Sequence, residues 1–309
     1  MALEKLGLVK MPVQKTPWWQ THAYTPTPVQ LSEEIIRIFV ACLDKNQVGR
    51  IGYVDVSAAD PTRVFAVSDA PALDVGEPGA FDDNGVTPVS IVRLGDELRL
   101  YYIGWQLSDQ VRYMLFVGVA TSHDNGRTFQ RLKKVPVLDC SDSELIVRTA
   151  ANVMHDGDIW RMWYIAGSKT ILHEDKQVPT YAMRYLESDD GISWGDYGAL
   201  VMEPDGEDEF GYGRPFVLKK PAGDFEMWYS IRSKSRRYHI GYATSDDGVT
   251  WKRQDDLATI AATTNGWDSE MMAFGAIADI AQRRYLFYNG NNYGEDGFGV
   301  AVWHDDDVS

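Results

Sequence analysis

The stretch Ile159-Trp160-Arg161-Met162-Trp163-Tyr164 has relatives along the whole chain and decides its fold. Each relative carries an aromatic residue at the position of Trp163, and these residues are Phe39, Tyr101, Trp228 and Phe287. We call the five residues the marker aromatics. They are separated by 62, 62, 65 and 59 residues. A period that regular indicates a repeated supersecondary unit.

Each repeat contains four short segments with strand character, and the third repeat shows them best. Asp-Gly turns separate its segments, which cover residues 146–154, 159–166 and 180–187 and a fourth that begins at residue 192. Such turns between β-branched and aromatic runs are strong hairpin signals. The hairpins at 121–129 and 244–251 look like the Asp-box motif, in which an aspartate binds backbone amides and a glycine takes a positive φ. We expect these motifs to be structural.

Helical periodicity is nearly absent, so the sequence predicts an all-β fold. Five units of four antiparallel strands predict a five-bladed β-propeller. We expect one domain, residues 1–309, with blades at about 22–73, 82–138, 144–202, 209–260 and 267–303. The last repeat lacks a fourth strand, whereas residues 6–13 have no partner in the first repeat. We therefore expect this N-terminal segment to pair with the last blade and close the ring.

Composition narrows the classes of partner and location. The 309 residues are 44% hydrophobic, which is ample for a folded core. The net charge of −15 repels phosphate backbones, so nucleic acid is a poor partner. The sequence has no apolar run of membrane-spanning length and no visible secretion signal. We therefore expect a cytoplasmic protein that does not bind membranes.

Titratable residues precede the first strand of every repeat. Counting back from the marker aromatics places five of them at equivalent positions: His22, Asp82, Glu144, Glu209 and Asp268. First strands line the channel of a propeller, so we expect these side chains at one channel mouth, the natural pocket. Further candidates at neighbouring positions are Tyr24, Asp83, Arg148, Arg214 and Glu270. Carboxylates accept hydrogen bonds from hydroxyls and arginines donate them in pairs, which predicts a site for a polyhydroxylated ligand.

Structural explanations of the same residues stay open. Asp82, Asp83 and Asp268 would lie in surface turns. Arg148 would form an ion pair with Glu144, and Arg214 with Glu209. His22 would be a structural histidine, and Tyr24 would be buried where the first and last blades meet.

The five units, the hairpins of the form Ser-Asp-Asp-Gly-x-x-Trp and the acidic residues before the first strands together resemble a known superfamily. It is the five-bladed propeller glycosidases, which include arabinanases, β-xylosidases, invertases, levansucrases and mannoside phosphorylases. The resemblance covers essentially the whole chain. It implies catalysis by carboxylates on different blades around the channel mouth, as glycoside cleavage requires.

Carried over to this chain, the resemblance makes Glu144 the general acid and Asp82 or Asp83 the orienting or basic carboxylate. The first blade departs from the pattern, because residues 22–28 contain no carboxylate. The base would then come from Glu209 or Glu270, or His22 would do part of its work. Five candidates are expected to bind substrate: His22, Tyr24, Arg148, Arg214 and Asp268.

Three functions follow as hypotheses. The first is a glycoside hydrolase or transglycosylase that acts on a small sugar, with anionic and nucleotide-linked sugars among the alternatives. The second is a sugar-binding propeller that has lost the catalytic aspartate of its first blade, and the third is a protein-interaction scaffold. No cofactor is expected and no zinc motif is present. A calcium ion in the channel is an alternative, because carboxylate clusters attract Ca²⁺.

Overall fold

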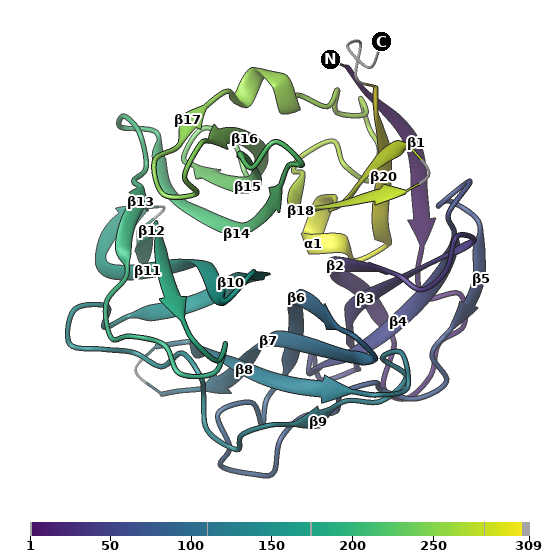
Figure 1. Ribbon diagram of the computed structural model, residues 1–309, viewed down its shortest axis with the longest axis horizontal. Helices are drawn as coiled ribbons and strands as arrows, with labels where there is room; N and C mark the ends of the chain where they lie inside the picture. The colour runs from purple at the N-terminus through teal and green to yellow at the C-terminus, as the bar shows by residue number, and fades with distance from the viewer. Residues whose placement is uncertain (1, 110, 174, 281, 305–309) are drawn as a thin grey trace.

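The protein is nearly all β, as the sequence predicts. The structure, a computed structural model, describes residues 2–109, 111–173, 175–280 and 282–304. Apart from strands, these residues form a 3-10 helix (Asp255–Ala258) and one helical turn, α1 (Asn291–Gly294). Antiparallel sheets surround a common centre, as in a β-propeller (Figure 1). No described helix is long and apolar enough to cross a membrane.

Two sheets come from the first half of the chain. The first contains, in spatial order, β2 (Thr21–Gln30), β3 (Ile35–Leu43), β4 (Gly49–Ser57) and β5 (Val64–Val67). The second contains β6 (Val86–Leu94), β7 (Glu97–Leu107), β8 (Tyr113–Ser122) and β9 (Gln130–Arg131).

The next sheet has eight strands in two halves. One half is β10 (Val147–Asp156), β11 (Ile159–His173), β12 (Lys176–Ser188) and β13 (Ala199–Met202). The other is β14 (Glu209–Lys219), β15 (Phe225–Ser233), β16 (His239–Ser245) and β17 (Lys252–Arg253). A parallel bridge between Tyr181 and Gly211 joins the halves.

The last sheet joins both ends of the chain. Its spatial order is β1 (Ala2–Lys10), β20 (Gly297–His304), β19 (Arg283–Asn289) and β18 (Ala273–Ile280). The N-terminal segment pairs antiparallel with the last strand, from Ala2 opposite His304 to Lys10 opposite Gly297. The pairing is the one expected, but it covers residues 2–10 rather than 6–13.

Strands β2, β6, β10, β14 and β18 lie nearest the centre (Figure 1). Each contacts the next around the centre, and β18 contacts β2. Each also has a register shift in its pairing with the following strand, as between Gly213 and Phe216 in β14. A bulge bends its strand and re-aims side chains. The prolines at 26, 88 and 215 occur at these shifts, because proline cannot donate to the ladder.

The marker aromatics are fully buried and join successive repeats. Tyr101 donates its hydroxyl hydrogen bond to the carbonyl of Gly191, and Trp163 donates from Nε1 to the carbonyl of Gly248, at 2.7 and 2.6 Å. Both glycines belong to the Asp-box turn of the following repeat. Phe39 likewise packs against Gly126, where an added Cβ would lie 2.4 Å from the ring.

The Asp-box motifs are structural, as predicted. Asp247 accepts hydrogen bonds from the amides of Val249 and Thr250 at 2.8 and 2.7 Å, and from the hydroxyl of Ser245 at 3.0 Å. Gly248 follows with φ 79°. The two backbone amides hold the pKa of Asp247 at about 2, below its ordinary 3.8.

Neutralising Asp247 is expected to remove a pH-dependent part of the stability. Because the folded-state pKa is lowered, its contribution is complete above pH 3.8 and is lost as the pH falls through about 2. The melting temperature of the wild type should therefore exceed that of Asp247→Asn at pH 6, and the difference should shrink from pH 3.8 downward and vanish below about pH 2. A difference that does not change with pH would contradict this role.

Candidate functional site

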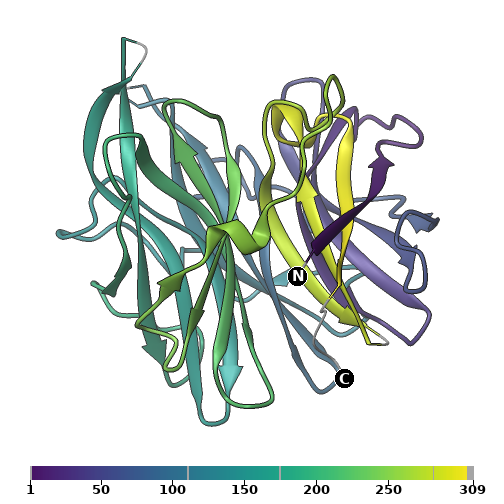
Figure 2. The ribbon, with the colours of Figure 1, turned by 90° about the horizontal axis from the view of Figure 1, so that it is seen from above.

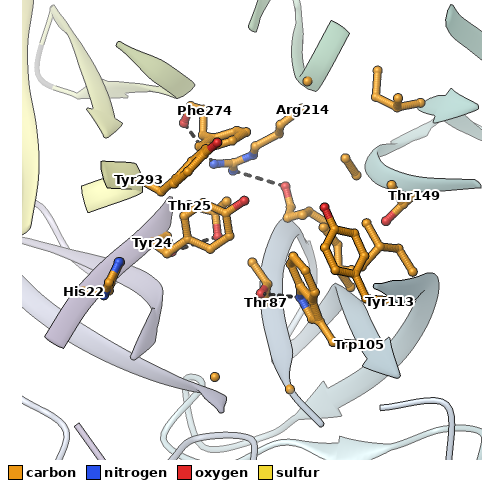
Figure 3. Close-up of a pocket in the computed structure, with 18 of the residues that line it drawn as sticks. His22, Tyr24, Thr25, Thr87, Trp105, Tyr113, Thr149, Arg214, Phe274 and Tyr293 are labelled. Carbon is orange, nitrogen blue, oxygen red and sulfur yellow. Dashed lines mark hydrogen bonds between the residues drawn. The ribbon is translucent and has the colours of Figure 1, made fainter. Parts of the chain in front are cut away.

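A cavity of about 530 Å³ opens at the centre of the protein. It is lined by the inner strands and by residues where other strands begin and end (Figure 3). The long hairpins β7–β8 and β11–β12 extend on one side of the molecule (Figure 2). Leu107, Tyr113 and Tyr181 of these hairpins contribute to the lining, so the cavity opens toward that side.

Two groups of aromatic side chains face each other across the cavity (Figure 3). One, which we call the Trp105 wall, is Trp105 with Tyr113, whose ring centroids are 5.0 Å apart. Trp105 is held in place because its Nε1 donates to the hydroxyl of Thr87 at 2.9 Å. The opposite group, the Tyr24 wall, consists of Tyr24, Tyr238, Phe274 and Tyr293, with neighbouring centroids 5.1 to 6.3 Å apart.

Hydroxyl groups of the walls are free to bind a ligand. Tyr24, Tyr113, Tyr238 and Tyr293 make no side-chain hydrogen bond to another residue that the structure describes. Burial, reinforced by neighbouring tyrosines, raises the pKa of Tyr24 well above its ordinary value. Burial also raises the pKa of Tyr238. The hydroxyls of Tyr24 and Tyr238 therefore stay protonated and can donate as well as accept.

Arg214 lies between the walls, and it is fully buried. Its Nη atoms donate to the carbonyl of Pro26 at 2.7 Å, to that of Val89 at 3.1 Å, and to the Thr27 hydroxyl at 3.0 Å. A longer bond of 3.3 Å reaches the carbonyl of Phe274. Its Nε has no hydrogen-bond partner among the described residues. Burial lowers the pKa of Arg214 to about 9, so the guanidinium is charged at neutral pH.

Two further arginines line the cavity. Arg232 lies over the rings of Tyr181 and Phe210, with its guanidinium carbon 4.6 and 4.5 Å from their centroids. Its Nη1 donates to the carbonyl of Pro179 at 3.3 Å. Arg112 lies at the exposed rim. Among the described lining residues there is no carboxylate, so the charged side chains that line the cavity are all positive.

Backbone strain is concentrated around the cavity. Six lining residues that are not glycine have φ values between 51° and 64°: His22, Thr25, Gln47, Ala150, Phe274 and Tyr293. For β-branched Thr25 such a φ is an outlier. Strain of this kind costs about 1–3 kcal/mol per residue and is found mainly at functional sites.

The structure brings three of the ten candidates from the sequence to the cavity: His22, Tyr24 and Arg214. Burial lowers the pKa of His22, against the opposing effect of Glu295 and Asp296, so the imidazole is neutral at pH 7. The other seven candidates do not line the cavity, and the expected ring of carboxylates at its mouth is therefore wrong.

The carboxylates are instead turned into their own sheets. Asp82, Glu144 and Asp268 each accept a hydrogen bond from the tyrosine twenty residues later, which directly follows a marker aromatic. A cation completes each cluster: Arg131 at 2.8 Å from Asp82, Arg148 at 2.5 Å from Glu144, and Lys5 at 2.5 Å from Asp268. The alternative of an ion pair between Arg148 and Glu144 is thus confirmed. The surface turns at Asp82 and Asp268 are wrong, because both carboxylates are buried in ion pairs. The pair of Arg214 with Glu209 is also wrong, because Glu209 pairs with Arg253.

Glu144 has the most complete cluster. Besides Arg148 it pairs with Arg184 at 3.2 Å and accepts the Tyr164 hydroxyl at 2.7 and 2.8 Å. The amide of Gly198 adds a contact of 3.4 Å. Glu144 is buried in this cluster and does not line the cavity.

The remaining acidic candidates are also engaged away from the cavity. Glu209 pairs with Arg253 at 2.7 Å. Burial raises the pKa of Glu209, but hydrogen bonds from Arg253 and from the amide of Asp205, with the Arg253 charge, leave it below its ordinary value. Glu270 is exposed and pairs with Arg237 at 3.0 Å. Asp83 accepts from the amide of Gly79 at 2.8 Å in the loop before β6.

These clusters explain the unusual first repeat. Where the other repeats have a carboxylate, it has His22, and where they have a tyrosine after the marker aromatic, it has Val40. The acid and its tyrosine partner are therefore absent together. In the second, third and fifth repeats the acid and this tyrosine are hydrogen-bonded to each other, so the first repeat lacks both members of a structural pair.

Counting back from the marker aromatics missed several cavity residues, because they lie where strands other than the inner ones begin or end. They are Trp105, Tyr113, Tyr181, Arg232, Tyr238 and Tyr293. The sequence did contain a signal for some of these residues, namely their spacing from the marker aromatics. Trp105 and Arg232 each stand four residues after a marker aromatic, as does Leu43, and all three line the cavity.

Metal binding finds no support in the described residues. They contain no group of three or more His, Cys, Asp or Glu side chains arranged to hold an ion. Calcium prefers several carboxylate and carbonyl oxygens, and the cavity lining lacks the carboxylates. A calcium ion in the channel stays a prediction.

Comparison with solved structures identifies the fold. A glycoside hydrolase aligns over 98% of this chain and 92% of its own, with a TM-score of 0.74 and 18% identity. A thermostable family-43 glycoside hydrolase aligns over 96% and 95%, with a TM-score of 0.70 and 15% identity. A glycosyl hydrolase from Bacteroides ovatus aligns over 97% and 90%, with a TM-score of 0.69 and 16% identity. The predicted resemblance to propeller glycosidases is confirmed for the fold.

Sequence comparison gives a nearer relationship. No family model matches the chain. The uncharacterized protein Rv1502 of Mycobacterium tuberculosis is 34% identical over 302 residues, which cover 98% of this chain and 99% of that protein. With nearly full coverage on both sides, the chain belongs to the family of Rv1502 and has the fold of the propeller glycoside hydrolases.

Proposed function

We propose that this protein is a carbohydrate-active five-bladed propeller whose central cavity binds a small sugar or sugar-derived molecule. The eight-stranded sheet counts as two blades, because one residue pair joins its halves. β1 supplies the outer strand of the last blade.

The observation that carries this function is the pair of aromatic walls with free hydroxyls. Sugars have apolar faces that pack on aromatic rings and hydroxyls that need hydrogen-bond partners. The Trp105 wall offers a ring fixed by Thr87, and the Tyr24 wall offers hydroxyls that have no hydrogen-bond partner among the described residues. The cavity of about 530 Å³ lies in the range of small-molecule sites, roughly 300–1,000 Å³.

Binding is better supported than cleavage by paired carboxylates. Such cleavage needs two carboxyl groups on either side of the scissile bond, roughly 5–9.5 Å apart. Among the described residues the cavity has none, and Glu144 and Asp82 are held in buried clusters. We therefore favour a sugar-binding propeller without carboxylate-based hydrolysis, which was the second hypothesis from the sequence.

Replacing Trp105 by alanine should weaken sugar binding by about tenfold, because an aromatic contact contributes up to ~1.5 kcal/mol. Calorimetric titration with a panel of mono- and disaccharides measures the loss. Tyr197→Ala is the matched control, because Tyr197 is an exposed aromatic outside the cavity. Equal affinity of Trp105→Ala and wild type for every sugar that binds would contradict the proposed site.

A second candidate, an enzyme that works without paired carboxylates, is favoured by one observation. Strained residues surround the cavity, and His22 among them is neutral and able to accept a proton. Product analysis after incubation with the same panel tests it. Turnover that is lost in His22→Asn, with binding retained, would establish an enzyme, and binding without products would exclude turnover of that sugar.

A further inference from the structure

The arginines of the cavity differ from all other arginines inside the protein. Among the described residues, each other buried or half-buried arginine pairs with a carboxylate, as Arg37 does with Asp55 at 2.7 Å. Arg214 and Arg232 have no carboxylate partner in the part of the chain that the structure describes. This exception is notable in a chain with 45 acidic residues and a net charge of −15.

From this exception we infer that the cavity contains an oxyanion subsite, formed by Arg214, Arg232 and the hydroxyls of Tyr24 and Tyr238, which binds the carboxylate or phosphate group of an acidic sugar. The inference rests on the proposed function and names the class of sugar.

The geometry of Arg214 supports the subsite. All its hydrogen bonds go to neutral acceptors, the carbonyls of Pro26, Val89 and Phe274 and the hydroxyl of Thr27. They fix the guanidinium without neutralising it. The buried Nε has no partner among the described residues. A buried charge is costly unless it is paired, so an anionic ligand would supply the missing partner.

Arg232 and the tyrosines complete the subsite. The Arg232 guanidinium carbon lies 5.8 Å from the ring centroid of Tyr238, and Tyr238 packs on Phe274, whose carbonyl accepts from Arg214. Tyr24 contacts the same Phe274 at a centroid distance of 5.1 Å. Tyr24, Tyr238 and Arg214 thus all contact one residue, Phe274, and Arg232 joins them through Tyr238. Guanidinium and phenol groups only donate toward an oxyanion, which fits carboxylate and phosphate oxygens.

Paired acidic and neutral sugars test the inference by calorimetric titration of the whole protein. Galacturonate is compared with galactose, and glucose 1-phosphate with glucose, and inorganic phosphate is titrated alone. We expect at least one acidic sugar to bind ten or more times tighter than its neutral partner, and its affinity to fall as salt is raised. Which pair shows the preference tells carboxylate from phosphate.

The variant Arg232→Gln should weaken acidic-sugar binding tenfold or more, as loss of a charge-assisted hydrogen bond does, and neutral-sugar binding less than twofold. Arg93→Gln, an exposed arginine outside the cavity, is the control and should change neither. The acidic preference of the unaltered protein is decisive by itself if the variant does not fold.

Each result has a distinct meaning. Equal binding of acidic and neutral sugars overturns the subsite and leaves the proposed sugar site intact. Binding of inorganic phosphate without any sugar overturns the proposed function and supports the oxyanion subsite. No binding of any probe overturns both. An acidic preference that Arg232→Gln does not reduce removes Arg232 from the subsite and overturns the inference as stated.

Discussion

Replacing Glu144 by alanine is expected to lower the free energy of unfolding by about 3–5 kcal/mol, the usual cost of removing one partner from a buried ion pair. Arg148 is 4% exposed at its side chain and would lose its carboxylate at 2.5 Å. Arg184 and the Tyr164 hydroxyl would lose the same acceptor. Urea unfolding followed by tryptophan fluorescence measures the change.

Two further variants separate this structural role from catalysis. Glu270→Ala breaks an exposed ion pair and should cost less than about 1 kcal/mol. Glu144→Gln should also be destabilised, because the amide cannot balance two arginines. A Glu144→Gln protein as stable as wild type, yet at least a hundredfold slower in glycoside turnover, would instead restore Glu144 as the general acid that the family resemblance implies.

Replacing Arg214 by methionine is the second change with a large expected effect, a destabilisation of about 3 kcal/mol or more. Methionine keeps an unbranched apolar stem but has no donors, so the carbonyls of Pro26, Val89 and Phe274 would lose their guanidinium. Each buried acceptor left unsatisfied costs roughly 1–3 kcal/mol, and relief from burying the charge offsets part of this sum. Thermal and urea unfolding measure the result.

Arg214→Lys keeps the charge but cannot reach three inner strands at once, so it should be destabilised as well. Arg93→Met is the control for loss of an exposed arginine. If Arg214→Met were as stable as wild type, the guanidinium would not hold β14 to β2, β6 and β18. Its only remaining role would then be toward a ligand.

Much of the architecture was predictable because it repeats. The marker aromatics recur at nearly constant spacing since each must fill the same position between neighbouring sheets, as Trp163 does against Gly248. The Asp-box turns were readable for a similar reason, because the hydrogen bonds of Asp247 are local in sequence. The N-terminal pairing followed from an unpaired strand at each end, although its bounds did not.

The site was less predictable, because spacing gives the position of a residue but not the direction of its side chain. Glu144 was placed correctly at the start of an inner strand, yet its partner Tyr164 turns it into the sheet. Arg214 reaches the axis because a bulge between Gly213 and Phe216 re-aims it. Tyr238 and Tyr293 come from connections between strands, and these carry no repeat signal.

The contacts between marker aromatics and Asp-box glycines all run the same way along the chain, from one repeat to the next. Each of the first three repeats presents a ring to the Asp-box turn of its successor, as Tyr101 does to Gly191 and Phe39 to Gly126. This is the head-to-tail relation of heterologous interfaces between identical subunits. These repeats therefore behave as covalently joined subunits, in which an extra copy would need both a ring and a turn to join its neighbours.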